Sequence, residues 1–530
     1  MESNLNSTPD MIHAATEPKP VKVEANPLLH TWLWQPNLIV FISSACIMIL
    51  ELVAGRIIAP YVGVSLYTWT SIIGVVLAGI SLGNYLGGQL ADRWASLRFL
   101  GGVFLLGGLS SFGILAADRL GNLTPGAWPI VANILITTTI LFFLPCLILG
   151  TVSPVVVKLA VRDLAKTGST VGKIYAAGTV GSILGTFMTG FVLISWFGTF
   201  AIVWGVAVLL LGMGLLLIVG HRWQVMLAAG LIIAAGSTLA FNQGWLHGPC
   251  LRETNYFCIK IREEERDGET VRILILDRLV HSYTSLATPT KLVYGYEKVY
   301  AEITAYRARH DNQLRALFIG GGGYTFPRYM EAVYPNSDVD VIEIDPGVTQ
   351  VAHDWLGLSP ETSITTFNQD ARLFLDQVPT HRYDLILGDA FNDFSVPYHL
   401  TTKEFNDRVK AWLVDDGLYL VNMIDGVRGD FLRAYVHTLR QSFDYVYLAP
   451  ATESWRISPR TTFVLIGTNA PLELFEFITI DAGDGEALLA GQVLSQTEVD
   501  DFLAEGQVVL LTDEYAPVDQ MLAPVVRGEE

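Results

Sequence analysis

Apolar residues follow two different patterns along the chain. Before position 250, seven apolar stretches are long enough to cross a bilayer as helices, at 37–58, 67–91, 97–117, 128–157, 172–196, 200–219 and 223–241. After position 250 the apolar runs are short and alternate with segments of helical length. The first pattern predicts a transmembrane helical bundle of about seven spans, and the second predicts an α/β domain with a mostly parallel sheet.

Composition and turn signals divide the chain further. We expect a disordered tail at 1–35, a transmembrane helical domain at 36–245, a Rossmann-like α/β domain at 291–475 and an acidic, solvated segment at 476–530. Between the two large domains, 250–290 holds two alternating segments around Asp267-Gly268, a dipeptide that favours a tight turn. This stretch predicts a small β-hairpin unit.

Charge separates the two halves as well. Residues 1–249 hold 11 of the 34 Lys and Arg and 8 of the 52 Asp and Glu, a net charge of +3. Residues 250–530 hold the other 23 and 44, a net charge of −21. Such a surface repels nucleic acid and attracts cations, polyamines among them, although solubility alone also explains it.

The loops between the predicted spans differ in positive charge. One side carries Arg56 and Arg119, whereas the N-terminal tail and the alternate loops carry Lys19, Lys22, Arg93, Arg98, Lys158, Arg162, Lys166, Lys173 and Arg222. Because basic loops stay in the cytoplasm, this asymmetry predicts a multi-pass protein of the cell membrane with a cytoplasmic N-terminus. Seven spans would then place the acidic domain outside the cytoplasm.

Two residue pairs near the bundle leave alternatives open. Cys250 and Cys258 flank the start of the β-hairpin unit, where they form a disulfide in an oxidising compartment or remain two thiols. Glu51 and Arg56 lie in or at the end of the first span, where ionisable residues are costly. They indicate either a structural role near the interface or a transport pathway.

A glycine run organises the α/β domain. Gly320–Gly323 end one apolar run, and after a helix-length segment a second apolar run ends in Glu343 and Asp345. Such glycines let the backbone approach a ligand at a helix N-terminus, and the later acid holds ribose hydroxyls. Further apolar runs end at Asp370 and Asp389, so these acids should gather at one sheet edge. No metal-ligand spacing is present, and no metal is expected.

Four segments carry a family resemblance. They are LFIGGGGYTFPRY, VIEIDPGVTQVA, NQDARLFL and YDLILGDAFNDFSVPYHLTTKEF, and their order and spacing resemble the spermidine synthase (polyamine aminopropyltransferase) family. The chain is similar to the branch in which such a domain is fused to a multispanning membrane region. The resemblance implies a methyltransferase-type domain that binds decarboxylated S-adenosylmethionine or S-adenosylmethionine as cosubstrate. It also implies a polyamine or related amine as second substrate, contact with the lipid bilayer, and a homodimer.

The resemblance also assigns nucleoside-binding residues. Glu343 would accept hydrogen bonds from the ribose diol, and Asp370 with Ala371 would meet the adenine amine. His281 stands where the family usually has a glutamine. The full set expected to bind the cosubstrate is Gly320, Gly321, Gly322, Gly323, Glu343, Asp345, Asp370, Ala371 and His281.

Three further residues are expected to carry the chemistry. In the family, an amine attacks the carbon beside a sulfonium and releases methylthioadenosine. A protonated amine cannot attack, so a carboxylate must take its proton. Asp389 matches that carboxylate, Asp393 would hold the far ammonium of a diamine, and Tyr296 falls near the family's tyrosine, with Glu297 beside it.

Two departures from the family pattern concern amine recognition. Gly323 stands where the family has an aspartate that holds the aminopropyl ammonium, and DAFND at 389–393 replaces the usual Asp-Ser-Ser-Asp-Pro. Losing the loop carboxylate also removes a repulsion against the carboxylate of intact S-adenosylmethionine. The first hypothesis is aminopropyl transfer to a diamine such as putrescine, giving spermidine. The alternatives are cleavage of, or transfer from, S-adenosylmethionine itself, and a nucleoside-binding transporter or sensor.

Overall fold

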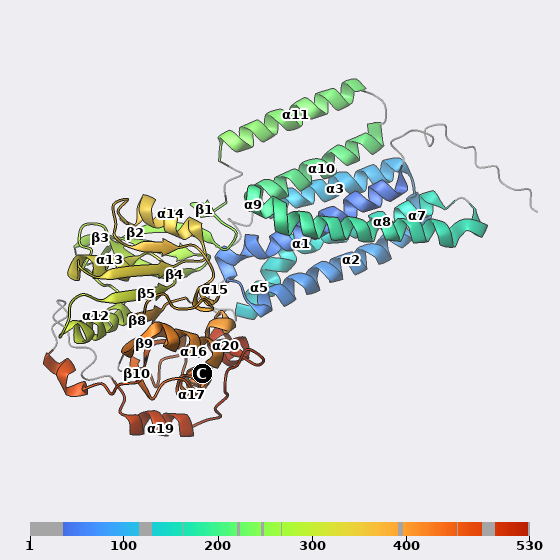
Figure 1. Ribbon diagram of the computed structural model, residues 1–530. Coiled ribbons are helices and arrows are strands. Elements are labelled where there is room, and N and C mark those ends of the chain that lie inside the picture. Colours follow the sequence, from blue (N-terminus) through green and yellow to red (C-terminus); the bar gives the residue numbers. More distant parts are fainter. Residues whose placement is uncertain are drawn as a thin grey trace, which may run out of the picture.

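The protein consists of a long helical bundle joined at one end to an α/β domain (Figure 1). The computed structural model describes residues 35–115, 130–161, 163–219, 223–244, 248–266, 268–390, 396–452, 454–479 and 493–527. The predicted order of bundle, small β-unit and α/β domain is confirmed within these residues.

Six helical runs in the described residues are long and apolar enough to cross a membrane. Serine hydroxyls start two of them: Ser65 accepts from the Thr68 N–H at 3.2 Å and Ser96 accepts from the Phe99 N–H at 3.1 Å. The helices of these runs are α1 Pro36–Val62, α2 Leu66–Trp94, α3 Leu97–Ile114, α5 Ile130–Thr138, η2 Thr139–Phe143, α6 Leu144–Gly150, α7 Val152–Ala160, η3 Leu164–Lys166, α8 Thr167–Met188, η4 Thr189–Leu193, α9 Ile194–Trp196 and α10 Thr199–Val219.

The seventh predicted stretch also forms a helix, α11, Trp223–Asn242, whose 20 residues reach the length of a membrane span. Within the described residues, its apolar portion Gly230–Asn242 is shorter than the six runs above. In Figure 1, α11 runs back along the bundle from the far end of α10 to the α/β domain and stands apart from the other helices.

The β-unit contains more strands than the predicted hairpin. Its sheet has the antiparallel order β1-β2-β3-β4, and Arg266 pairs with Glu269 across the predicted turn, whose Asp267 lies outside the described residues. The strands are β1 Arg252–Glu253, β2 Cys258–Arg266, β3 Glu269–Leu276 and β4 Leu279–Ser285. This sheet links α11 to the α/β domain.

The large sheet has the order β10-β11-β9-β8-β5-β6-β7. Neighbours from β7 to β9 are parallel, and β11 and β10 are antiparallel, which confirms the mostly parallel sheet. The strands are β5 Arg315–Ile319, β6 Asp338–Ile342, β7 Thr365–Phe367, β8 Tyr383–Gly388, β9 Leu413–Asp425, β10 Tyr445–Pro450 and β11 Thr461–Thr468. Their order places the carboxyl ends of β5, β6, β7 and β8 at one edge.

Helices cover both faces of this sheet. One buried core includes Val299, Met330 and Val351, and a second includes Phe405 and Leu432 on the opposite face. The first core is built on α12 Gly295–Ala308, α13 Thr325–Val333 and α14 Pro346–Trp355; the second is built on α15 Ala371–Leu375, η5 Tyr398–Leu400, α16 Lys403–Trp412, α17 Asp430–Leu439, α19 Gln496–Ala504 and α20 Val518–Arg527. A short helix, η6 Leu474–Thr479, precedes the last part of the chain.

The C-terminal segment packs on the domain instead of being solvated throughout. Val499, Phe502 and Leu511 are buried in the second core, and the Leu511 N–H donates to the Thr438 hydroxyl at 3.0 Å. Acidic composition predicted a solvated segment because it conceals these few apolar anchors.

Candidate active site

The glycine run forms the turn between β5 and α13. Glu343, just after β6, is buried and accepts from the Gly321 N–H at 2.8 Å through Oε2 and from the Asp345 N–H at 2.9 Å through Oε1. Burial raises the pKa of Glu343, although these backbone bonds oppose the rise. The glycine loop and Glu343 are therefore together, as the sequence predicts.

Asp345 is held by the fold on both carboxylate oxygens. Its Oδ1 accepts from the Gly347 N–H at 2.8 Å and caps α14, and its Oδ2 accepts from the Thr254 hydroxyl at 2.5 Å. The carboxylate thus contacts the loop between β1 and β2. Asp345 supports Glu343 through its backbone N–H. The sequence suggested that Asp345 binds the nucleoside directly, whereas these contacts give it an indirect role.

Gly323 has no room for a side chain. A Cβ at this position would collide with the Ser282 hydroxyl on β4 and would lie 3.0 Å from the Thr284 hydroxyl. Ser282 is buried, and its Oγ has no hydrogen-bond partner among the described residues. The glycine in place of the family's aspartate is therefore matched by its surroundings, because hydroxyls on β4 occupy the place of a carboxylate.

Asp370 and Ala371 lie beyond the end of β7. Asp370 Oδ1 accepts from the Arg372 N–H at 2.8 Å, and its Oδ2 is 3.5 Å from His399 Nε2. Ala371 is buried. Asp370 thus begins α15 and turns its second oxygen toward the loop of His399.

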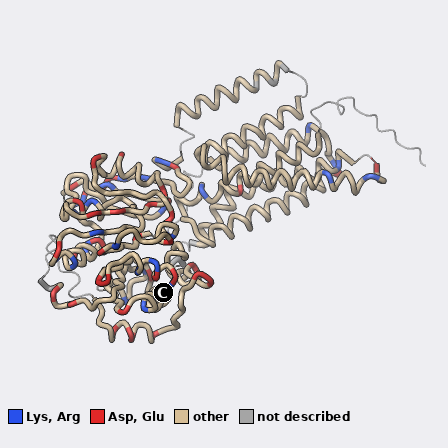
Figure 2. Tube along the Cα trace, in the orientation of Figure 1, with Lys and Arg blue, Asp and Glu red and all other residues tan. Residues whose placement is uncertain are grey.

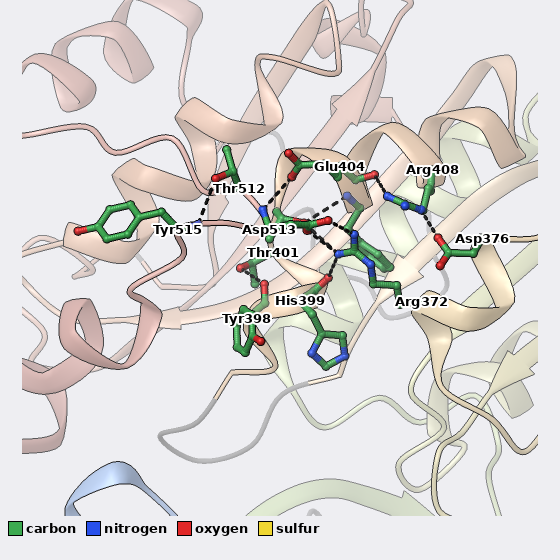
Figure 3. Close-up of polar contacts among 12 residues, drawn as sticks. Arg372, Asp376, Tyr398, His399, Thr401, Glu404, Arg408, Thr512, Asp513 and Tyr515 are labelled. Carbon is green, nitrogen blue, oxygen red and sulfur yellow. Dashed lines mark hydrogen bonds and ion pairs between the residues drawn. The ribbon is translucent and has the colours of Figure 1, made fainter.

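A polar cluster beside this position fixes the His399 loop (Figure 3). Arg372 donates through Nη1 to the His399 carbonyl at 2.7 Å and to Asp513 Oδ1 at 2.8 Å. Thr402 Oγ1 also donates to Asp513 Oδ1, at 2.7 Å. Partial burial of Asp513 opposes the effect, but the bonds from Arg372 and Thr402 lower its pKa. The C-terminal segment thereby supports the edge of the candidate site.

Asp389 lies at the end of β8 in a buried polar cluster. Its Oδ1 accepts from Asn422 Nδ2 at 2.7 Å, and its Oδ2 accepts from the Tyr296 hydroxyl at 3.1 Å. Burial raises the pKa of Asp389 although both donors oppose the rise. Burial, with the nearby charge of Asp389, also raises the pKa of Glu297 to about 8. Tyr296 and Asp389 are therefore in contact.

The two remaining predicted site residues are His281 and Asp393. His281 Nδ1 lies 3.0 Å from the Leu279 carbonyl oxygen, and the charge of His281 acts on Asp389. Asp393 lies outside the described residues, so its predicted role stays a prediction.

Sequence reasoning missed Asn422 and Tyr300. Asn422 is a polar residue within the apolar run 418–424 of β9, a pattern that signals a special role, but its contact with Asp389 depends on strand order. The buried Asn422 Oδ1 has no hydrogen-bond partner among the described residues, and the Tyr300 hydroxyl interacts with the Asn422 backbone. Such buried atoms can receive ligand groups.

A cavity of about 270 Å³ opens beside this cluster. Its lining includes Tyr294, Tyr296, Ser454, Arg460 and Thr461, and Tyr296 connects it to Asp389. No group of three or more potential metal ligands occurs in the part of the chain that the structure describes. The donor set, with carboxylates at several strand ends, fits an adenosyl-type cosubstrate.

Comparisons with known proteins agree with this arrangement. No model of a known protein family matches the chain. A polyamine aminopropyltransferase of Vibrio vulnificus is 36% identical over 110 residues, which cover 20% of this chain and 37% of that protein. A probable polyamine aminopropyl transferase of Bifidobacterium longum is 30% identical over 191 residues, which cover 33% of this chain and 42% of that protein. The chain therefore spans less than half the length of these two relatives.

A third relative extends beyond the α/β domain. Polyamine aminopropyltransferase 2 of Streptomyces coelicolor is 23% identical over 411 residues, which cover 72% of each protein. An alignment of this length is longer than 250–530, so it includes part of the helical region. With the predicted motifs in place in the fold, the chain is similar to polyamine aminopropyltransferases over its α/β domain and, more distantly, over part of the helical region.

Proposed function

We propose that the chain is a membrane-anchored enzyme that transfers an aminopropyl group from an adenosyl-sulfonium donor to an amine. The first substrates are decarboxylated S-adenosylmethionine and putrescine, with spermidine and methylthioadenosine as products. The observation that carries the proposal is the partly buried Asp389, which Tyr296 and Asn422 hold at the same sheet edge as Glu343.

The residues of the site have two kinds of role in this reaction, substrate binding and proton transfer. Glu343 accepts hydrogen bonds from the ribose, and Asp370 receives the adenine amine. Asp389 takes a proton from the acceptor ammonium, and the freed amine attacks the carbon beside the sulfonium. The new C–N bond forms as the C–S bond breaks, and its electron pair returns to sulfur in methylthioadenosine. A pKa above the usual value makes Asp389 a stronger base for this step.

Glu297 limits the charge in the cluster. With a pKa of about 8, its carboxyl is mostly protonated at neutral pH, so it adds little repulsion to the ionised form of Asp389. The acceptor enters through the cavity beside Tyr296, which leads toward Asp389.

One specific observation favours a second sulfonium substrate, intact S-adenosylmethionine. The Gly323 position faces the Ser282 and Thr284 hydroxyls, which can donate hydrogen bonds to a carboxylate. An aspartate there would repel the carboxylate of intact S-adenosylmethionine. Transfer from, or cleavage of, S-adenosylmethionine itself is therefore the second candidate function.

The experiment incubates the purified full chain with each sulfonium compound, with and without putrescine, and identifies products by mass. We expect spermidine and methylthioadenosine with the decarboxylated donor and putrescine together. Methylthioadenosine from S-adenosylmethionine without putrescine would favour the second candidate. Loss of a general base typically costs about 10²-fold or more, so Asp389→Asn should lower the turnover rate by at least that factor. The fully exposed Asp415 provides the control variant Asp415→Asn, which should turn over normally.

We also propose that the α/β domain lies on the non-cytoplasmic side. The domain contacts the end of the bundle where α1 ends and α10 begins, whereas Figure 2 shows basic residues at the opposite end. Basic residues mark the cytoplasmic side. The disulfide between Cys250 and Cys258 fits an oxidising compartment. Labelling an introduced cysteine at Asp415 in intact cells with a membrane-impermeant reagent tests this, and protection of that cysteine until lysis would contradict it.

A further inference from the structure

A short disulfide-closed loop joins the bundle to the α/β domain. Cys250 and Cys258 form the disulfide, and within the loop Glu253 pairs with Cys258 across β1 and β2. We call residues 250–258 the clasp loop. A disulfide restricts the conformations open to the chain that it encloses, so this loop has a defined shape at the boundary.

Two membrane helices hold the outer side of the clasp loop. Arg56, near the end of α1, donates through Nη1 to the Asn255 carbonyl at 2.8 Å and through Nη2 to the Thr254 carbonyl. Glu253 Oε2 accepts from the Thr199 N–H at the start of α10, at 2.6 Å. The guanidinium therefore binds two consecutive carbonyls with charge-assisted hydrogen bonds, which fix the peptide between them.

The inner side of the clasp loop contacts the nucleoside site. The Thr254 hydroxyl donates to Asp345 Oδ2 at 2.5 Å, and the Asp345 N–H donates to Glu343 Oε1 at 2.9 Å. Gly347, in the first turn of α14, makes room for this contact, because a Cβ there would collide with Thr254 Cγ2. Shifting Thr254 would therefore shift the support of Glu343.

We propose that Arg56 is a positioning residue for the nucleoside site, acting through Thr254 and Asp345 on Glu343. The inference rests on the proposed function of that site as the adenosyl-binding site. It explains an arginine near the end of α1, because the guanidinium binds the backbone of the clasp loop. The membrane anchor is thus part of the binding site's support.

The test measures methylthioadenosine binding and donor kinetics with the full chain in detergent or nanodiscs. Arg56→Gln should weaken methylthioadenosine binding and raise the donor KM by about tenfold. This is the size expected when a charge-assisted hydrogen bond is lost and only part of its free energy reaches the binding site. The turnover rate at saturating donor should stay within about twofold, because Asp389 is untouched. Arg56→Lys, which keeps the charge, should recover part of the affinity.

Thr254→Val provides a second variant that leaves both carbonyls for Arg56. It removes the bond to Asp345 at nearly constant volume, so it tests the inference even where Arg56→Gln fails to fold. The double variant should bind no more weakly than the worse single variant, because both changes break the same path. Lys260→Gln is the matched control: its ammonium reaches the Pro60 carbonyl at 3.4 Å across the same boundary but outside the clasp loop, and affinity should not change.

The possible results separate the two proposals. Wild-type protein that binds methylthioadenosine, with Arg56→Gln or Thr254→Val binding equally well, would overturn the inference alone. Independent, multiplying effects of the two substitutions would also overturn it. Wild-type protein that neither binds nor releases methylthioadenosine would contradict the proposed function, and the inference would fall with it.

Discussion

The substitution Asn422→Leu isolates the electrostatic control of Asp389. The Asn422 amide donates to Asp389 Oδ1 at 2.7 Å, and its own Oδ1 has no partner among the described residues. Leucine keeps a similar volume and removes the donor. The ionised form of Asp389 loses a hydrogen bond, while the protonated form loses much less. The pKa of Asp389, already raised by burial, should therefore rise further.

The size of this shift follows from the strength of the bond. A hydrogen bond to a charged group contributes about 1.5–3 kcal/mol, and one pKa unit corresponds to about 1.4 kcal/mol. The pKa should therefore rise by roughly one to two units. Tyr296→Phe, which removes the longer 3.1 Å bond, should cause a smaller rise.

The assay is the pH profile of kcat/KM for methylthioadenosine release between about pH 5 and 9. The acid limb of Asn422→Leu should move to higher pH by the stated amount, and the rate on the alkaline side should stay close to that of the wild type. Asn406→Leu is the control, because Asn406 is a buried amide that accepts from Tyr435 and not from the Asp389 cluster. An unmoved acid limb, or a rate lost equally at every pH, would refute the reasoning.

Two further predictions concern stability. The folded-state pKa of Glu297, about 8, lies above the ordinary 4.5, so the wild type should lose up to a few kcal/mol of stability as pH rises from about 5 to 9. Glutamine does not titrate, so Glu297→Gln should not lose this stability. The variant should therefore become more stable relative to the wild type as pH rises. Thermal unfolding at several pH values measures this, and a pH-independent difference would contradict it. Asp513→Asn should destabilise the C-terminal segment by about 1 kcal/mol at neutral pH, a modest value because Asp513 is partly exposed. Its lowered pKa means that this stability is fully present above the ordinary pKa and disappears as pH falls through the lower folded-state pKa. Wild type and variant should therefore converge at acidic pH, below the ordinary pKa. Limited proteolysis tests this, and equal cleavage at neutral pH would contradict it.

Local sequence pattern was enough to predict that the glycine run and the acids at the strand ends lie together in the candidate site. The glycine run and Glu343 are separated by one helix, and a β-α-β unit of that length brings them together in a parallel sheet. Asp370 and Asp389 follow for the same reason, since each ends a strand of that sheet. These predictions needed only the order of strands and helices.

Contacts between distant segments could not be predicted in this way. Asn422 reaches Asp389 because β9 lies beside β8, and Asp513 reaches Arg372 across 141 positions of sequence. Thr254 and Asp345 are likewise joined across 91 positions. Side-chain chemistry gives no signal for such pairs. We therefore expected Asp345 to bind the ligand, whereas its carboxylate caps α14 and accepts from Thr254 in the clasp loop.

The most direct test of the central claim is the product formed by the full chain from decarboxylated S-adenosylmethionine and putrescine. We predict release of methylthioadenosine together with spermidine in equal amounts, abolished by Asp389→Asn and retained by Asp415→Asn. Release of neither product by a wild-type protein that is folded and binds methylthioadenosine would contradict the account.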